Sequence, residues 1–213
     1  MLTIHHLGKS QSERIVWLCE ELGIPYRLEH HKRDAVTKLS PPELRAMHPM
    51  GTAPVITDGD VVLAESGAIV DYIIGRHGGG RLARGPADPD FADYLYWYHF
   101  ANASLQPVMG RNMLLHRLKL PADNPVLVST LERLDRALSW VDERLAANAF
   151  LAGSELTAAD IMAVFSLTTM RYFMPVDFGP YPHILAYLRR IAGREAYQRA
   201  MQKGDPGMAL LLT

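Results

Sequence analysis

The chain has 213 residues, a formal net charge of −1 at neutral pH and a single cysteine, Cys19. Its length suffices for one large domain or two small ones, and we expect two. Its 22 basic and 23 acidic residues are balanced, which argues against nucleic acid or an anionic membrane as a partner. One cysteine excludes an internal disulfide framework and a paired-thiol redox or zinc motif. The first seven residues are too few and too polar for a signal peptide, and no run of about 18 apolar residues occurs, so we expect a cytoplasmic protein.

The N-terminal segment predicts a strand, a helix and a second strand. Apolar and polar residues alternate well enough from Leu2 to Leu7 to predict a short strand. The apolar residues between Ile15 and Leu22 recur at intervals of three and four, which predicts a helix that ends at Gly23. Cys19 lies in the apolar stripe of this helix, so we interpret it as a core residue rather than a reactive thiol. Residues 26–30 predict the second strand, which completes a βαβ unit with parallel strands.

The segment Thr52–Ala68 carries the densest signals in the chain. Two runs rich in β-branched residues flank an Asp-Gly turn and precede a helix start, which predicts a hairpin followed by a helix. Pro54 opens the first of these strands, where the missing N–H is tolerated, and an X-Pro bond readily adopts the cis form. A cis Ala53-Pro54 bond would turn the peptide groups of Val55 outward, where they could pair with an extended peptide-like ligand.

The helix after this hairpin predicts a site for a carboxylate. Ser66 has the character of an N-cap for a helix that runs through about His77. Such a start places the positive end of the helix dipole beside Glu65. The Glu65-Ser66 pair alone would favour a capped helix that binds nothing, because capping serines are common. The whole succession of signals in Thr52–Ala68, taken in order, favours a ligand site instead.

The composition changes after this predicted helix. Residues 78–89 are dense in glycine and proline, and beyond them the apolar pattern is helical and no strand signal returns. We therefore divide the chain into a first domain at residues 1–78, a linker at 79–89 and an all-helical domain at 90–213. Thr157 and Asp160 predict a capping box at the start of one core helix. The expected helices of the second domain are Asp90–Leu118 (one helix or two), Leu127–Leu145, Ala158–Arg171, a helix that begins near Pro180, and Glu195–Met201.

Three features resemble the glutathione S-transferase family. The Ala53-Pro-Val segment and the later Glu65-Ser-Gly-Ala-Ile segment together resemble the family's glutathione-binding region. Ser10, the fourth residue before Arg14, resembles the catalytic serine of the serine-type classes. The capping box of the second domain resembles that of the family's core helix. The resemblance implies an α/β domain of thioredoxin-like fold at the N-terminus, followed by an all-helical C-terminal domain.

This resemblance assigns roles to residues of the first domain. Pro54 is the cis-proline, the backbone of Val55 pairs with the cysteinyl part of glutathione, and Glu65 with Ser66 binds the γ-glutamyl end. Thr52 departs from the pattern, because many members carry a lysine or glutamine there that contacts the glycyl carboxylate. The alternatives for that contact are His31, Lys32 and Lys38.

The same resemblance gives Ser10 the role of stabilising the thiolate. The pKa of a thiol such as that of glutathione is about 8.5 or slightly above. A hydroxyl donor near a helix N-terminus favours the thiolate through its hydrogen bond and through the dipole. Ser10 and Glu13 also form a capping-box pattern, so a helix cap is the competing interpretation, and Ser12 is the second candidate for the thiol contact. No tyrosine lies between His5 and Arg14 and no cysteine takes the place of Ser10, which favours conjugation over deglutathionylation.

We therefore expect a glutathione transferase in which the thiolate of bound glutathione attacks a small hydrophobic electrophile. The alternatives are a glutathione-dependent peroxidase or disulfide reductase, and a non-catalytic binding protein of the same fold. The resemblance also implies a homodimer and a role in detoxification. His5 and His6 are neighbours on a strand and face opposite sides, and no third ligand follows at a suitable spacing, so we assign no metal ion. We expect the electrophile between the domains, against Leu7 and Gly8, with these candidates in the helical domain: Tyr98, Met109 and Met113.

Overall fold

The computed structural model describes residues 1–212, which form two compact units. The first unit comprises Met1–Leu82 and Ala192–Ala209, and the second comprises Ala83–Ile191 with the residues after Ala209. This division differs from the boundaries expected from the sequence at Ala192–Ala209, which groups with the strands of the first unit. No helix of the described chain combines the length and the apolar character needed to cross a membrane.

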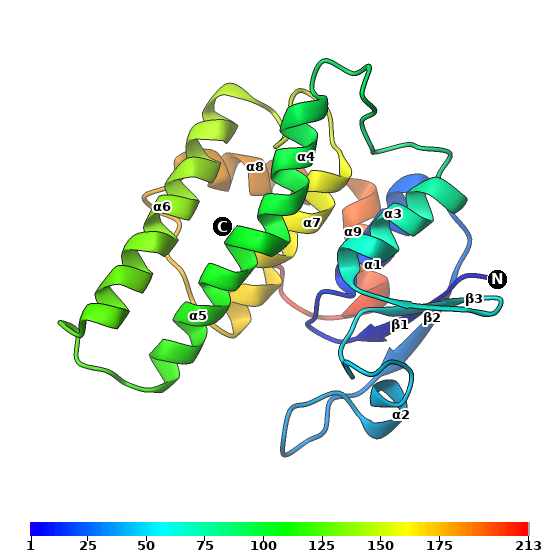
Figure 1. Ribbon diagram of the computed structural model, residues 1–213, viewed down its shortest axis with the longest axis horizontal. Coiled ribbons are helices and arrows are strands. Elements are labelled where there is room, and N and C mark those ends of the chain that lie inside the picture. Colours follow the sequence, from blue (N-terminus) through cyan, green and yellow to red (C-terminus); the bar gives the residue numbers. More distant parts are fainter. Residues whose placement is uncertain (213) are drawn as a thin grey trace. The chain divides into compact units, whose positions relative to one another are not determined.

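The first unit is built on a sheet of four strands in the order β2-β1-β3-β4. Strand β1 pairs in parallel with β2, and β3 runs antiparallel to both β1 and β4. This mixed sheet, which begins with a βαβ unit, confirms the thioredoxin-like fold predicted for the N-terminal part of the chain (Figure 1). The strands are β1 (Thr3–Leu7), β2 (Arg27–His31), β3 (Val55–Asp58) and β4 (Val61–Ala64).

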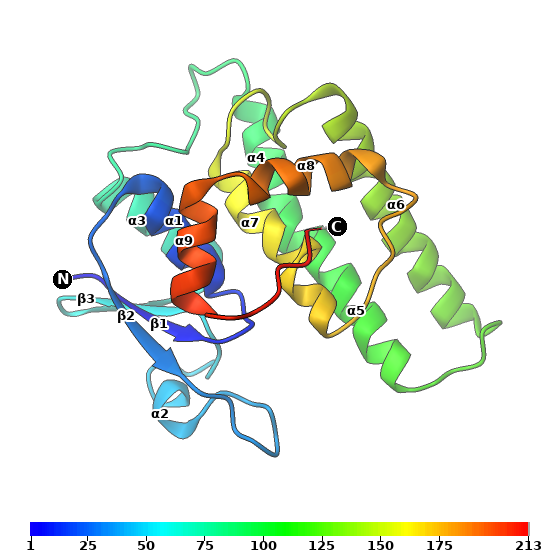
Figure 2. The ribbon, with the colours of Figure 1, turned by 180° about the vertical axis from the view of Figure 1, so that it is seen from behind.

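The helices of the first unit cover the two faces of the sheet unequally (Figures 1 and 2). One face carries α1 (Glu13–Leu22), α3 (Ser66–Arg76) and α9 (Glu195–Gly204), whereas the other carries only the short helix α2 (Pro42–Arg45) among the described elements.

Alternation along β1 divides its side chains between these two faces. Leu7 packs against Leu44 of α2. His6 points the other way, because its ring occupies the space that a side chain on Gly204 of α9 would need. His5 lies two residues before Leu7 and therefore shares the α2 face.

Helix α9 is held against α1 by charged and aromatic contacts. The carboxylate of Glu21 accepts two hydrogen bonds from the guanidinium of Arg194, at 2.7 and 2.8 Å. The rings of Trp17 and Tyr197 meet edge to face with their centroids 5.0 Å apart. The sequence predicted helix α9, but the periodicity of its residues did not indicate that it packs against α1.

The described elements of the second unit are all helical, which confirms the class predicted for this part of the chain. The segment Asp90–Leu118, expected to form one helix or two, forms two α-helices joined by a π-helical turn, η1, and the helix expected to reach Arg171 ends at Leu167. A 3₁₀ turn, η2, follows it. The elements are α4 (Phe91–Phe100), η1 (Ala101–Leu105), α5 (Gln106–Arg117), α6 (Pro125–Ala147), α7 (Ala158–Leu167), η2 (Thr169–Tyr172) and α8 (Pro182–Ala192).

The start of α7 is fixed by the predicted capping box. The hydroxyl of Thr157 accepts a hydrogen bond from the backbone N–H of Ala159, and the carboxylate of Asp160 accepts one from the N–H of Thr157 at 2.9 Å. Two backbone donors of the first turn are thereby satisfied inside a buried region.

Candidate functional site

Ser10 lies in the turn between β1 and α1, and its side chain is 8% exposed. Its hydroxyl oxygen accepts a hydrogen bond from the N–H of Ser12 at 3.2 Å. The capping box with Glu13, which was the competing interpretation, is not formed, because the N–H of Glu13 donates to the backbone carbonyl of Ser10 and not to its hydroxyl. Helix α1 begins at Glu13 with Ser12 at the N-cap position. The Ser10 hydroxyl therefore bonds only the N–H of the N-cap residue and none of the first helical turn.

Ser12, the second candidate for the thiol contact, is completely buried. Its hydroxyl oxygen accepts a hydrogen bond from the N–H of Leu7 at 3.1 Å and lies 2.8 Å from the hydroxyl of Ser10. On its other side it lies 2.9 Å from Nδ1 of His6. Ser12 thus links Ser10 to a buried histidine.

An aspartate from the other end of the chain continues this connection. Nε2 of His6 lies 3.3 Å from Oδ2 of Asp205, a close electrostatic contact that falls short of an aligned hydrogen bond. The carboxylate of Asp205 also accepts from the N–H of Lys9, at 3.0 and 3.2 Å to its two oxygens. Asp205 directly follows α9, so the packing of α9 on α1 completes a continuous series of polar contacts from Asp205 through His6 and Ser12 to Ser10.

Two glycines leave room for this series of contacts. A Cβ atom on Gly204 would lie 3.1 Å from Cε1 of His6, and one on Gly8 would lie 2.9 Å from Oδ1 of Asp205. Such separations are at or below the lower limit of normal packing, so a larger residue at either position would displace the histidine or the carboxylate.

Arg14 connects the beginnings of α1 and α3. Its side chain is 1% exposed, and Nη1 donates to Oε1 of Gln11 at 2.8 Å and to the hydroxyl of Ser66 at 3.0 Å. The Ser66 hydroxyl is itself 3.4 Å from Oε1 of Gln11 and donates to it. These contacts place Ser66 and the turn that carries Ser10 on one hydrogen-bonded framework.

The start of α3 differs from the sequence prediction by one residue. Ser66 is the first helical residue and is not the N-cap, which is Glu65. Glu65 is exposed and has φ 69°, in the left-handed region that residues other than glycine seldom adopt. This backbone conformation places the Glu65 side chain at the N-terminal end of α3 and leaves the Ser66 hydroxyl to Arg14.

The Ala53-Pro54 peptide bond is cis, as the sequence predicted. Val55 begins β3 opposite His5 of β1 and Ala64 of β4, and its side chain is fully buried. Pro54 and Val55 thus belong to the same unit as Ser10 and Ser66.

The residues considered for the glycyl carboxylate are engaged in different ways. Thr52 and Lys32 are exposed. Nζ of Lys38 donates to the carbonyl of Ala35 at 2.7 Å. His31 lies beside His5, whose pKa is lowered by burial against an opposing effect of the nearby Glu29 carboxylate.

The remaining candidates from the sequence lie in the cores of the two units. Cys19 is completely buried, and burial raises the pKa of its thiol to about 12, which confirms the interpretation as an unreactive core residue. Tyr98 is 5% exposed and Met109 is completely buried, whereas Met113 is partly buried. Tyr98 and Met109 are therefore packing residues of the second unit.

The chain belongs to the glutathione S-transferase family. Residues 7–81 match the family model of the glutathione S-transferase N-terminal domain, and residues 99–195 match that of the C-terminal domain. These matches confirm the fold and the family that the motifs around Pro54, Glu65 and Ser10 predicted.

Individual relatives support the same family membership. The chain is 30% identical to glutathione S-transferase 3 of Schizosaccharomyces pombe, over 100% of this chain and 92% of the relative. A crystal structure of a glutathione S-transferase from Actinobacillus pleuropneumoniae has a TM-score of 0.86 and 32% identity, over 96% of this chain and 93% of that one. A family member from Pseudomonas fluorescens, solved with two glutathione molecules bound, shares the fold with a TM-score of 0.77 at 21% identity, over 94% and 92% of the two chains.

Proposed function

We propose that the protein is a glutathione transferase in which Ser10 stabilises the thiolate of bound glutathione for attack on a hydrophobic electrophile. The observation that carries this proposal is the Ser10 hydroxyl, which lies in the turn before α1, forms no capping box with Glu13 and is backed by Ser12 and His6. Family membership supplies the ligand class, and the arrangement of side chains supports the role of this serine.

The series of contacts behind Ser10 can direct its proton toward a ligand. When both ring nitrogens of His6 carry a proton, Nε2 faces the carboxylate of Asp205 and Nδ1 donates to the Ser12 hydroxyl, which in turn donates to the oxygen of Ser10. The Ser10 hydroxyl proton is then available to a sulfur atom, while its oxygen also accepts from the N–H of Ser12. Hydrogen bonds in a series polarise one another, so this arrangement makes Ser10 a better donor to a thiolate. The dipole of α1 acts in the same direction.

The other parts of glutathione are assigned to the same unit. We propose that the backbone of Val55, after the cis-proline Pro54, pairs with the cysteinyl residue of glutathione. Glu65 and Ser66 take its γ-glutamyl end, Glu65 binding the amino group and the N-terminal end of α3 binding the carboxylate. The buried contacts from Arg14 to Ser66 hold this end in a fixed relation to Ser10.

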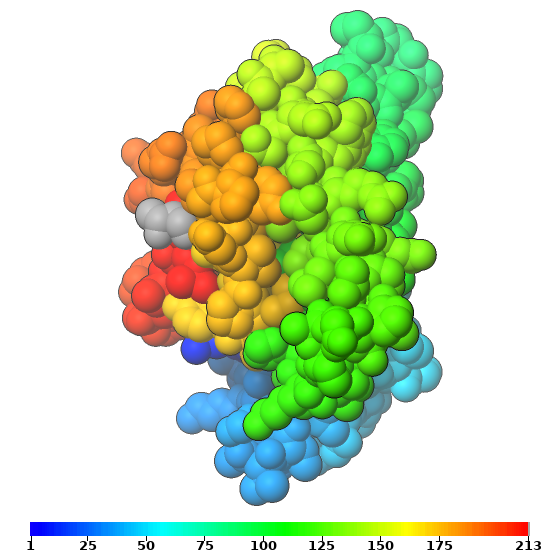
Figure 3. All heavy atoms as spheres, turned by 90° about the vertical axis from the view of Figure 1, so that its left-hand side faces the viewer, coloured from blue at the N-terminus to red at the C-terminus, as the bar shows by residue number. Residues whose placement is uncertain are grey.

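We further propose a cytoplasmic homodimer, supported by an apolar hollow on the second unit. The hollow has a volume of about 540 Å³ and lies between α4 and α6, the latter running along the surface of its unit in Figure 3. Tyr96 and Trp140 line it and are 49% and 46% exposed, with Nε1 of Trp140 donating to the hydroxyl of Tyr96 at 3.0 Å. Arg133 and Arg136 lie at its border. Exposed aromatic residues with arginines beside them are typical of protein interfaces.

Three parallel assays test the activity. They measure conjugation of glutathione to 1-chloro-2,4-dinitrobenzene, glutathione-dependent reduction of cumene hydroperoxide and reduction of a glutathione mixed disulfide, with calorimetry of glutathione binding alongside. The proposal predicts binding and conjugation. Turnover of the peroxide or the mixed disulfide without conjugation would establish a reductase or peroxidase, and absence of glutathione binding would leave a non-catalytic member of the family.

A further inference from the structure

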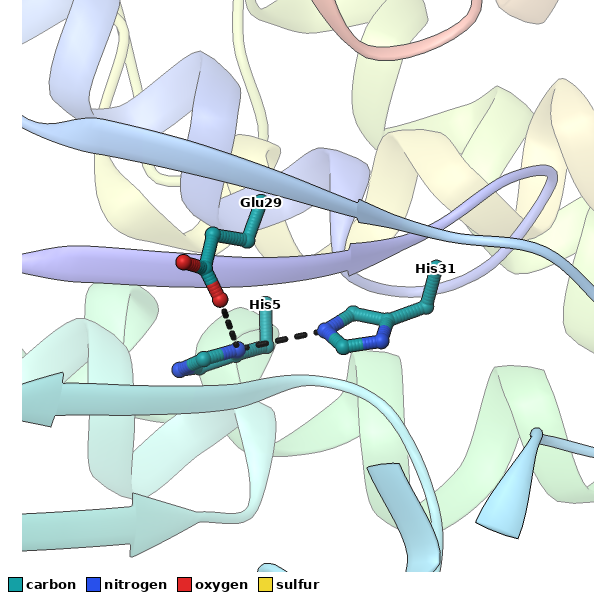
Figure 4. Close-up of side chains that lie close together, drawn as sticks. All are labelled: His5, Glu29 and His31. Atoms are coloured by element: carbon teal, nitrogen blue, oxygen red, sulfur yellow. Dashed lines mark hydrogen bonds and ion pairs between the residues drawn. The ribbon is translucent and has the colours of Figure 1, made fainter. Parts of the chain in front are cut away.

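Three side chains of the ligand type lie together on the α2 face of the sheet, away from Ser10. His5 of β1 is the register partner of Glu29 of β2, and His31 lies two residues further along β2, so all three point to one face. Figure 4 shows the imidazole of His5 between the carboxylate of Glu29 and the ring of His31. One ligand atom from each residue lies within 4.8 Å of the other two, and this is the one such group of three among the described residues.

The distances in this group match those of a tetrahedral metal site. Nδ1 of His5 lies 3.2 Å from Nε2 of His31 and 3.3 Å from Oε2 of Glu29. In a four-coordinate zinc site with metal–ligand bonds of about 2.0–2.1 Å, neighbouring ligand atoms are about 3.3–3.4 Å apart. Two edges of such a tetrahedron are therefore already formed. A single proton on Nδ1 of His5 could serve only one of its two neighbours, whereas a metal ion would serve all three ligand atoms.

The second ring nitrogen of His5 has a hydrogen-bond partner, whereas that of His31 has only a longer contact with a carboxylate. Nε2 of His5 lies 3.4 Å from Oγ1 of Thr57, and Nδ1 of His31 lies 3.9 Å from Oε1 of Glu43, beyond hydrogen-bonding distance. Metal-bound histidines commonly direct the second ring nitrogen to such an acceptor, which fixes the ring and leaves the first nitrogen free to bind.

The group is also sheltered and anchored. The side chain of His5 is 7% exposed, that of His31 11% and that of Glu29 33%. The other oxygen of Glu29 pairs with Arg27, which leaves Oε2 directed toward His5. Two imidazoles and one carboxylate, with one open position, form a donor set that zinc favours.

We propose that His5, Glu29 and His31 form a zinc site with a water molecule at the fourth position. The site joins the edge strand β2 to β1, and it assigns His31 to the metal rather than to the glycyl carboxylate of glutathione. It departs from the sequence-based expectation of no metal ion, which rested on the opposite orientations of His5 and His6 and on the lack of a third ligand at a suitable spacing. The parallel register of β1 and β2 brings Glu29 and His31 beside His5.

Metal titration of the tag-free, glutathione-free protein tests the proposal, because glutathione would itself bind zinc through its thiol. After treatment with a chelator, we expect one Zn²⁺ per chain with a Kd of about 1 μM or tighter, measured against a chromophoric competitor. Co²⁺ should give the intense visible absorption of a four-coordinate site. Zinc at about a hundredfold excess over Kd should raise the midpoint of thermal unfolding by about 5 °C.

Matched variants separate this site from incidental binding. His31→Gln and Glu29→Gln lie on the edge strand and should fold, and each should weaken binding by about tenfold or more. His30→Gln changes the intervening residue, which faces the other side of the sheet, and His116→Ala removes an exposed imidazole from the second unit; both should bind as the wild type does. The proposal is overturned if the wild type does not bind one Zn²⁺ per chain, or if His31→Gln binds it equally well.

Discussion

At the residue scale, Ser10 and Ser12 carry the same hydroxyl group in different surroundings. Ser12 is completely buried and shares its oxygen among Leu7, His6 and Ser10. Ser10 lies at the end of this series and is the more exposed of the two. The position in the series, rather than the side chain itself, therefore assigns Ser10 to the ligand and Ser12 to the support of Ser10.

Asp205→Asn tests whether the remote end of this series matters. The amide keeps the shape and an acceptor for the N–H of Lys9, but it removes the charge beside His6. A hydrogen-bond contribution of about 1 kcal/mol corresponds to about 0.7 pKa units, so we expect the pKa of the bound glutathione thiol to rise by up to about that amount. The absorbance of the thiolate during a pH titration measures it. Asp88→Asn, in the second unit, is the control. An unchanged thiol pKa in Asp205→Asn would show that Asp205 and His6 do not stabilise the thiolate.

At the element scale, Asp160 holds the start of α7. Its carboxylate is completely buried and accepts from the N–H of Leu151, from both the N–H and the hydroxyl of Thr157, and from the hydroxyl of Tyr187. Burial raises the pKa of Asp160, and these hydrogen bonds oppose the effect. The carboxylate is a structural group of the second unit and not part of a catalytic site.

Asp160→Ala should therefore be strongly destabilising. It leaves two buried N–H groups and the Tyr187 hydroxyl without this acceptor, and the free energy of unfolding should fall by about 3–5 kcal/mol. Urea unfolding followed by circular dichroism measures the loss. Thr157→Ser keeps both halves of the capping box and should lose less than about 1 kcal/mol. A loss for Asp160→Ala no greater than that for Thr157→Ser would contradict this role.

The attachment of α9 to α1 should weaken in acid. Burial alone would raise the pKa of Glu20, but hydrogen bonds from Lys203, Tyr26 and Arg199 lower it below its ordinary value of 4.5. Because the folded-state pKa is the lower one, this contribution to stability is present above the unfolded-state pKa and is lost as the pH falls through the folded-state pKa. Thermal unfolding of the wild type and Glu20→Gln should thus differ near neutral pH and converge as the pH falls through the lowered folded-state pKa of Glu20.

Glu195→Gln provides the control for this pH dependence. Glu195 also contacts Arg199, at 3.5 Å, but its side chain is 89% exposed, and exposed ion pairs contribute little. Its unfolding midpoint should follow that of the wild type at every pH. A constant difference between the wild type and Glu20→Gln across the whole range would contradict the linkage.

At the scale of the whole molecule, the apolar hollow between α4 and α6 leads to a prediction about assembly. Sedimentation equilibrium should show a dimer. Tyr96→Glu places a charge among the exposed aromatic residues and should weaken the dimer by about a hundredfold or more, because burying an unpaired charge costs about 3 kcal/mol. Val126→Glu, at an exposed position near the start of α6, should have no effect. A monomeric wild type, or equal dimerisation of Tyr96→Glu, would contradict this interface.

Local signals account for the parts of the fold that the sequence predicted. Alternation in β1, the helical spacing in α1, the Asp-Gly turn and the Thr157-Asp160 box each act within a few residues, so each could be read directly. The Ser66 cap was misplaced by one residue because Glu65 adopts a positive φ that nothing in its side chain requires. The π-helical turn after α4 likewise has no marker in the sequence.

Contacts between distant segments account for what could not be predicted. The motif around Ser10 and Arg14 identified the serine, but Asp205 lies at the other end of the chain and reaches His6 only because α9 packs against α1. The helical period of α9 shows which residues are apolar, but not which surface they meet. The grouping of His5 with Glu29 and His31 depends in the same way on the parallel register of β1 and β2.

We propose above all that Ser10 stabilises the thiolate of bound glutathione. Titration of the bound thiol by its thiolate absorbance, on the wild type, Ser10→Ala and Ser12→Ala, tests it most directly, with circular dichroism to confirm the fold. We expect the wild type to have a thiol pKa at least about one unit below the free value of about 8.5. That shift should be largely lost in Ser10→Ala and partly lost in Ser12→Ala. Tight glutathione binding with the same depressed pKa in Ser10→Ala would contradict the claim and leave Ser10 as a structural residue of the turn before α1.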